Sequence, residues 1–309
     1  MGGTTIPVDG VLSIGEHGKY PVNKYGQQLY PRKRFFEEIT DTFQKYGRVV
    51  PVFNDKHIST VWEEALWMYN RSVDFKVPFM SGSSLPVSYR TNPIDIPMGS
   101  EIESAVGIGY SGLDIYGFHA LEVYQTLVER RKNAEKGVRW VRCLEGADVW
   151  TAVKEGLVDA EVMDAVYNAV PRTKQDIRQD GAAVLFQFEY TDGFLGSLFM
   201  LSSVQLSGVG IRLKGQSPVA TAFEERPEPR YPHFAFLLKA IETMVYSGRP
   251  TYPVERTLLT GGILDRALRS KFDNSKKIET PELMISYTPN DYPHAPKPDL
   301  LSQPALKIK

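Results

Sequence analysis

A polar cluster, Asn54-Asp55-Lys56-His57, follows directly on the apolar run at residues 49–53. An amine and an imidazole beside a carboxylate can exchange protons once their surroundings tune their pKa values. Lys and Asp are rarely buried together unless they are paired or in use. We therefore expect this strand end to carry functional groups.

Two further polar groups also follow apolar runs: Glu16 and His17 after residues 8–15, and Ser81, Ser83 and Ser84 after residues 77–80. In open parallel sheets, ligands bind beyond the carboxyl ends of the strands. The three groups should therefore meet in one crevice. The alternative is that they are solvated loop residues with local hydrogen bonds.

A third candidate group lies in a helix expected over residues 112–131, where Asp114, His119 and Glu122 are the notable polar residues. A histidine near a carboxylate can act as a general acid or base. Together with His17 it could instead bind a divalent metal. The third possibility is a core histidine whose ring is satisfied by Glu122.

The elements that must position these groups alternate between strand and helix. We expect strands at residues 8–15, 49–53 and 77–80, with helices at 31–46 and 60–74; Thr60 and Glu63 are spaced as a capping box. Helix-length crossovers require parallel strands. This is one half of a doubly wound sheet, and the usual first half with its glycine-rich turn would precede Met1.

The remainder reads as α+β. Beyond residue 97 we expect strands at 138–144, 182–190 and 194–203, two short helices within 148–170, and closing helices at 233–247 and 254–271. Asp192-Gly193 is a hairpin signal. The predicted fold class is thus α/β, with a partial, N-terminally truncated Rossmann-like sheet before an α+β domain holding a mainly antiparallel open sheet. The expected domains are 1–92, 93–285 and a Pro-rich arm at 286–309.

One exposed face of the antiparallel sheet would favour a homo-oligomer. The chain has 309 residues, a net charge of −1 and one cysteine, Cys143. A net charge this close to zero does not indicate binding to nucleic acid or to an anionic membrane. No apolar run is long enough to span a bilayer, and the N-terminus has no signal-peptide pattern. We expect a cytoplasmic protein.

Gly107-Ile108-Gly109-Tyr110-Ser111-Gly112 spells the G-x-G-x-x-G of dinucleotide sites. Glu101 and Glu103 argue against a central parallel strand before it, which would be apolar on both faces. The next acidic strand end, Glu145, also lies farther away than the usual distance of about 20 residues. We expect a close approach of backbone to a ligand or to the neighbouring domain instead.

The order of these motifs resembles the Gfo/Idh/MocA oxidoreductases. Asp55-Lys56-His57 resembles a variant of the family's Glu-Lys-Pro, which places Lys56 at the lysine near substrate and nicotinamide. The stretch from Gly109 to Glu122 resembles the family's segment ending in Asp-x-x-x-His, with Asp114 displaced by one position. His119 matches the usual catalytic histidine. The closing helices, with Ser247-Gly248-Arg249-Pro250 between them, are also similar.

This resemblance implies a nicotinamide cofactor, NAD(P), and a sugar- or polyol-like substrate, with no metal. It implies these site residues: Lys56, His119 and Asp114 for catalysis; Glu16, His17, Asn54 and Asp55 for the cofactor; His57, Ser83, Arg90 and Glu122 for the substrate. Two alternatives remain open. One is a metal-dependent lyase or hydrolase using His17, His119 and Glu122, and the other is a non-catalytic sugar-binding module.

Overall fold

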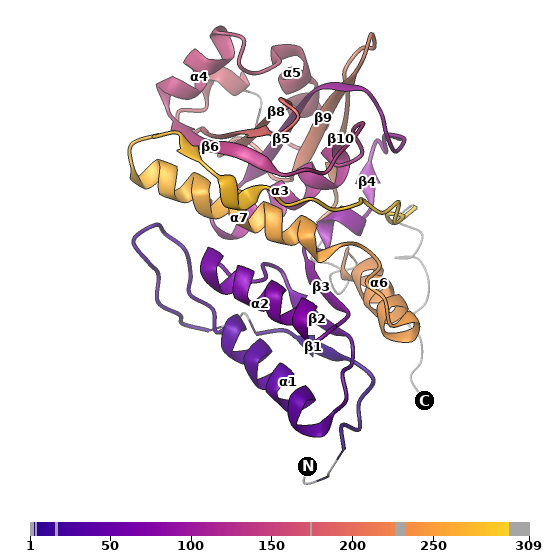
Figure 1. Cartoon of the computed structure of the whole chain (residues 1–309). Helices are drawn as coiled ribbons and strands as arrows, with labels where there is room; N and C mark the ends of the chain where they lie inside the picture. The colour runs from indigo at the N-terminus through magenta and orange to yellow at the C-terminus, as the bar shows by residue number, and fades with distance from the viewer. Residues whose placement is uncertain (1–2, 4, 16–17, 174, 226–232, 297–309) are drawn as a thin grey trace.

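The protein is described by a computed structural model for residues 3, 5–15, 18–173, 175–225 and 233–296. It is a mixed α/β fold with a three-stranded parallel sheet and an eight-stranded, mainly antiparallel sheet, which confirms the predicted class. In Figure 1 the small sheet lies in the lower half with helices α1 (Arg32–Tyr46) and α2 (Trp62–Asp74). Helix α7 (Val254–Phe272) runs between this sheet and the large one above it.

The small sheet has the order β1-β2-β3 with both pairs parallel. Its strands are β1 (Val11–Ser13), β2 (Val52–Asp55) and β3 (Phe79–Gly82), connected through α1 (Arg32–Tyr46) and α2 (Trp62–Asp74). Helix α1 ends where Gly47 takes a φ of 64°, a left-handed conformation that glycine adopts without strain. The predicted β-α-β-α-β alternation is confirmed.

Two local expectations in this region are wrong. The first strand is shorter than predicted and not buried, with Leu12 43% exposed. It is one edge of the sheet, whereas the other edge strand, β3, contacts α7. The capping box does not form, because α2 begins at Trp62 and the Thr60 hydroxyl donates instead to the Gln28 carbonyl, 2.9 Å away. Strands β2 and β3 are fully buried and extend into the polar clusters. Asn54, Asp55 and Ser81 therefore belong to the sheet itself, while Lys56, His57 and Ser83 follow directly on its strands.

The large sheet has the order β11-β6-β7-β8-β5-β9-β10-β4. Its strands are β4 (Arg90–Thr91), β5 (Ile102–Tyr110), β6 (Val138–Glu145), β7 (Val184–Tyr190), β8 (Leu195–Leu201), β9 (Gly208–Leu213), β10 (Val219–Phe223) and β11 (Ile278–Glu279). The β7–β8 hairpin turns at Asp192-Gly193 as predicted, while β5 and β8 pair in parallel. Strands β9 and β10 were not predicted.

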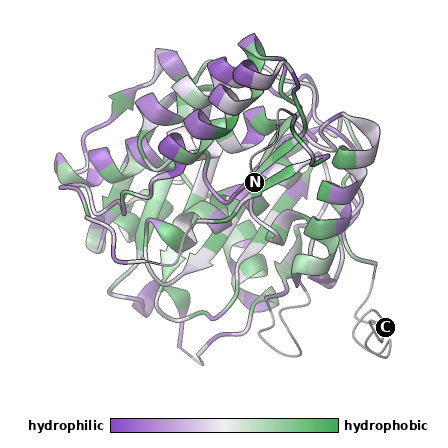
Figure 2. Ribbon diagram, turned by 90° about the horizontal axis from the view of Figure 1, so that it is seen from below, coloured by the Kyte–Doolittle hydropathy of each residue, from purple (hydrophilic) through white to green (hydrophobic). Residues whose placement is uncertain are grey.

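Five more helices and three short 3₁₀ turns complete the described part. They are α3 (Ile115–Val128), α4 (Ala147–Lys154), α5 (Ala160–Ala169), α6 (His233–Ser247) and α7 (Val254–Phe272), with η1 (Leu85–Val87), η2 (Ile177–Gln179) and η3 (Pro281–Leu283). Figure 2 shows mostly apolar strands surrounded by helices whose polar residues mark the periphery.

Both faces of the large sheet are covered, so the expectation of one solvent-exposed face is wrong. Side chains such as Phe186 and Leu198 pack in the cluster that contains α3 and α7. Phe199 on the opposite face packs in the cluster formed with Val162 and Val166 of α5. Two short amphipathic helices, α4 and α5, therefore cover the face that was expected to support a homo-oligomer, and that argument for one no longer holds.

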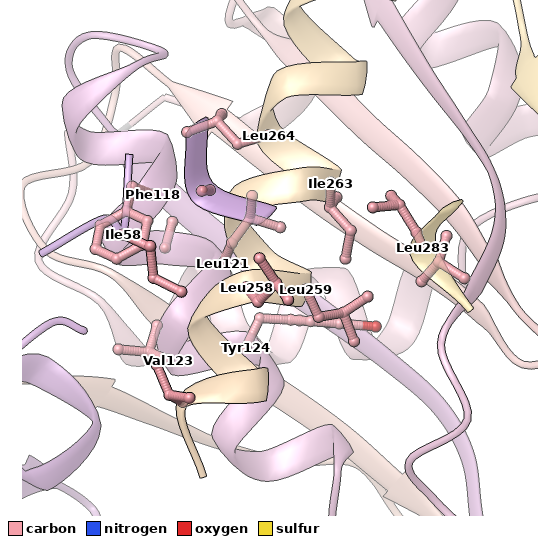
Figure 3. Packing of buried hydrophobic residues seen from close by; sticks show 14 of the residues in the cluster. Ile58, Phe118, Leu121, Val123, Tyr124, Leu258, Leu259, Ile263, Leu264 and Leu283 are labelled. Atoms are coloured by element: carbon pink, nitrogen blue, oxygen red, sulfur yellow. The ribbon is translucent and has the colours of Figure 1, made fainter. Parts of the chain in front are cut away.

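Helix α3 lies between the large sheet and α7, and every residue from Gly117 to Val128 is buried. Figure 3 shows Phe118, Leu121 and Tyr124 of α3 beside leucines of α7. Polar side chains on such a helix must find their hydrogen-bond partners inside the protein. His119 and Glu122 are two of them.

The remaining segments pack on these layers. Helix α6 covers a face of the small sheet, where Leu237 and Ile241 pack with Phe53 and Met80. The described part of the predicted C-terminal arm also lies against the protein, and the Ala295 backbone N–H donates to the Val87 carbonyl at 3.0 Å. Residues 297–309 of that arm lie outside the described residues.

Candidate functional site

Lys56 sits in a tight turn at the end of β2 with a φ of 66°, the left-handed region. Its backbone N–H donates to the Gly82 carbonyl at 3.1 Å. The Ser81 hydroxyl donates to the Lys56 carbonyl at 2.6 Å, and the Asn54 amide donates to the His57 carbonyl at 2.6 Å. Because β2 and β3 are adjacent, Asn54 and Ser81 together hold the turn that presents Lys56.

The Lys56 side chain is paired and largely shielded from solvent. Its Nζ lies 2.9 Å from Asp55 Oδ2, and the two side chains are only 15% and 10% exposed. Nζ also lies 5.9 Å from the centre of the Phe234 ring. A lysine held this way can donate a hydrogen bond to a ligand oxygen while its carboxylate partner balances its charge.

His119 reaches the small sheet through Ser83. Its Nδ1 lies 2.7 Å from the Ser83 hydroxyl oxygen, while the Ser83 backbone N–H donates to Glu122 Oε2 at 3.2 Å. The two residues of α3 thus meet at Ser83, and the alternative of a histidine satisfied by Glu122 is wrong. Burial, with the charges of Lys56 and His233, lowers the pKa of His119 to about 3. The imidazole is therefore neutral at physiological pH.

Glu122 ties three elements together. Besides Ser83, it accepts a hydrogen bond from the Thr260 hydroxyl at 2.6 Å. The Thr257 hydroxyl lies 3.4 Å from Glu122 Oε2 and donates to the nearer Ser81 carbonyl at 2.9 Å. Burial raises the pKa of Glu122, against the opposing effects of Arg256 and of the hydrogen bonds from Thr260 and Ser83. Gly82 makes room for it, because a Cβ there would lie 2.7 Å from Glu122 Oε2. The described contacts of Glu122 are structural, and its role in substrate binding stays a prediction.

His57 and Asp114 form a second buried polar spot next to this one. The His57 ring stacks on Phe118 with centroids 4.0 Å apart, and its ring nitrogens are buried. Burial, Arg32, His119 and Lys56 all lower the pKa of His57, whereas a hydrogen bond with the Asp114 backbone raises it. Asp114 Oδ2 accepts from the Gln28 N–H at 3.0 Å, whereas its buried Oδ1 has no described partner. This oxygen could hydrogen-bond a hydroxyl of a ligand or a water molecule.

The Asp114 carboxyl should make folding stability depend on pH. Burial raises its pKa to about 6 from the usual 3.8. Between these values the folded state keeps a proton that the unfolded state loses, so stability falls as the pH rises through this window. Two pKa units correspond to at most about 3 kcal/mol. Urea unfolding of wild type and Asp114→Asn should show wild type losing about 2 kcal/mol relative to the variant between pH 4 and pH 7.5. A pH-independent difference would contradict the raised pKa.

Arg90 is not part of this cluster, and Glu16 and His17 lie outside the described residues. Arg90 lies in β4, where it donates to the Pro86 carbonyl at 3.3 Å and lies over the Phe223 ring. Burial, with Arg130 and Arg256 nearby, lowers the pKa of Arg90 to about 10. No described contact joins Arg90 to Lys56, Ser83 or His119.

Sequence reasoning missed the supporting residues on and before α7. Thr257 and Thr260 are three apart, a spacing that places them on one helix face. That pattern was available, but Glu122, which both hydroxyls approach, is distant in the chain. Tyr252, whose buried hydroxyl has no described partner, was also missed. Burial and the charge of Glu122 raise the pKa of Tyr252.

Two glycines of the 107–112 motif, Gly107 and Gly109, serve packing. Gly107 and Gly109 lie in β5, and a Cβ on Gly109 would lie 2.6 Å from the Ala120 Cβ of α3. The close approach is therefore to α3 and to β8, and not to the neighbouring domain as one of the predicted alternatives had it. No other glycine-rich turn of this pattern follows a strand of the small sheet in the described residues. The described residues thus do not fit the pyrophosphate of a dinucleotide in the usual way.

The described part of the chain contains no group of three or more His, Cys, Asp and Glu side chains that could hold a metal ion. The metal hypothesis also needs His17, which lies outside it. Among these residues no helix has the length and apolar character needed to cross a membrane.

Solved structures of dehydrogenases share this fold. GenD2 from gentamicin A biosynthesis, in complex with NAD, is 12% identical, with a TM-score of 0.55 over 88% of this chain and 78% of that one. The myo-inositol dehydrogenase of Lactobacillus casei, in complex with NAD(H) and myo-inositol, is 9% identical, with a TM-score of 0.53 over 89% and 79%. The Corynebacterium glutamicum myo-inositol dehydrogenase is 13% identical, with a TM-score of 0.52 over 89% and 81%. No protein-family model and no curated protein matches the sequence.

Proposed function

We propose that this chain is a Gfo/Idh/MocA-like oxidoreductase acting on a sugar- or polyol-like substrate, with NAD(P) as the implied cofactor. The fold is shared with enzymes whose structures contain NAD and myo-inositol. The observation that carries the proposal is that Lys56 and His119 are both held by serines at the end of β3. Ser81 holds the turn of Lys56, and Ser83, two residues later, contacts the ring of His119.

In this proposal Lys56 Nζ donates a hydrogen bond to the reacting oxygen and orients it. Asp55 keeps Nζ in place through their 2.9 Å pair. His119 holds a proton at the same oxygen, and Asp114 Oδ1, which has no described partner, receives a further hydroxyl of the substrate. The low exposure of these groups would strengthen each hydrogen bond by excluding water.

The test combines binding with turnover. The purified chain is titrated calorimetrically with NAD, NADP and myo-inositol, and nicotinamide reduction is followed by absorbance with myo-inositol and a panel of sugars. The proposal expects polyol-dependent reduction of one dinucleotide. Binding of neither dinucleotide would overturn it.

A non-catalytic sugar-binding module is the second candidate. The packing role of Gly107 and Gly109 favours it, because the described residues then offer no glycine cradle for a dinucleotide. This candidate predicts polyol binding without any binding of NAD or NADP. It also predicts that Lys56→Ala and His119→Ala bind the polyol nearly as wild type does.

A further inference from the structure

The Ser83 hydroxyl has only a small set of possible hydrogen-bond partners. A serine hydroxyl donates one hydrogen bond and can accept two. The Leu85 backbone N–H donates to Ser83 Oγ at 3.1 Å, and His119 Nδ1 lies 2.7 Å from the same oxygen. Ser83 is 2% exposed. Among the described residues, no further hydrogen bond of this hydroxyl is found.

We infer that Ser83 donates its hydroxyl proton to Nδ1 of His119 and thereby fixes the neutral imidazole with its own proton on Nε2. In the opposite tautomer, Nδ1 would donate to Ser83, and Oγ would then accept from both Nδ1 and Leu85. The hydroxyl proton would be left buried without an acceptor, which is strongly disfavoured. The Nε2–H form should therefore exceed the Nδ1–H form by at least about tenfold.

The residues around Ser83 hold its backbone in place, which keeps its hydroxyl beside Nδ1 of His119. Its backbone N–H is held by Glu122 Oε2, and the other carboxylate oxygen of Glu122 accepts from Thr260. The preceding Gly82 has a φ of 138° and lies against the Glu122 carboxyl. The hydroxyl is consequently presented to His119 by a rigid strand end.

The tautomer of His119 has a consequence for ligand binding, and this consequence rests on the proposed function. With the proton on Nε2, neutral His119 is a hydrogen-bond donor, and Lys56 Nζ is a second donor in the same cluster. Two donors suit a ligand oxygen that only accepts, so the resting site favours the carbonyl form of a sugar or polyol over its alcohol. Ser83 is thus a positioning residue that acts through His119.

The experiment is ¹⁵N NMR of the imidazole nitrogens in the uniformly labelled full chain at pH 7. The His119 resonances are assigned by their loss in His119→Gln. The inference expects a pyridine-type Nδ1 and a pyrrole-type Nε2. Ser83→Thr, which keeps the hydroxyl, should retain this pattern, and Ser83→Ala should reduce the tautomer ratio by at least about tenfold. Ser88→Ala is the matched control, because the buried Ser88 hydroxyl donates to the Leu85 carbonyl at 2.9 Å instead.

A pyrrole-type Nδ1 in wild type would overturn the inference, and so would an unchanged ratio in Ser83→Ala. If Ser83→Ala does not fold, the spectra of wild type and Ser83→Thr still decide between the tautomers. The readout needs no cofactor and no turnover. Failure of dinucleotide binding with the Nε2–H tautomer intact would count against the proposed function alone.

Discussion

Replacing Lys56 by methionine is expected to lower polyol-dependent turnover at least about a hundredfold, the range for losing a positioned proton or hydrogen-bond donor. Methionine keeps most of the apolar stem but removes Nζ, which lies beside Asp55 and over Phe234. The loss should appear in kcat more than in KM, because Nζ acts at the reacting oxygen. Steady-state kinetics with myo-inositol would measure the split.

The Lys56→Met variant also leaves Asp55 without its lysine, so a stability effect must be separated from the chemical one. Lys56→Arg restores a cation for Asp55, but its planar fork cannot reproduce the compact amine. We expect Lys56→Arg to unfold near the wild-type temperature and still to turn over slowly. Lys132→Met is the control, because Lys132 is 63% exposed and pairs with Glu101 on the surface. Recovery of turnover in Lys56→Arg would show that charge alone suffices.

The order of elements in the small sheet could be predicted from the sequence because its signals are local. Apolar runs of strand length alternate with helical spacing, and Gly47 marks the end of α1. Strands β9 and β10 gave no such signal. Gly208 and Gly210 interrupt the alternation of β9, and they are required by a distant element: a Cβ on Gly210 would lie 2.8 Å from the Val162 carbonyl of α5.

The candidate site, like the fold, has a part that the sequence predicts and a part that it does not. The polar residues after β2 and β3 could be identified because strand ends of a parallel sheet share one edge. The hydrogen-bond partner of each of these residues could not be predicted. Asn54 and Ser81 hold backbone carbonyls only because β2 and β3 pair in the observed register. Glu122 accepts from Thr260 only because α3 packs on α7.

The largest expected effect on stability comes from replacing Arg256, which pairs with Glu129 where α3 packs on α7. Arg256 Nε donates to Glu129 Oε2 at 2.8 Å, and a second guanidinium nitrogen donates to Oε1. The two side chains are 4% and 1% exposed. Arg256→Met should therefore lower the free energy of unfolding by about 3 to 5 kcal/mol, because it leaves a buried carboxylate without its cation.

Two comparisons isolate the origin of that loss. Arg178→Met removes an ion pair whose members, Arg178 and Asp164, are 41% and 45% exposed, and it should cost less than about 1 kcal/mol. The double variant Arg256→Met with Glu129→Gln removes both buried charges, and Tyr287 can still donate to position 129, as it does to Glu129 at 2.7 Å. It should regain at least half of the loss in urea unfolding, because an uncompensated charge costs more than a neutral pair. If the double variant were as unstable as Arg256→Met, lost packing of the arginine stem, rather than an unpaired Glu129, would be the cause.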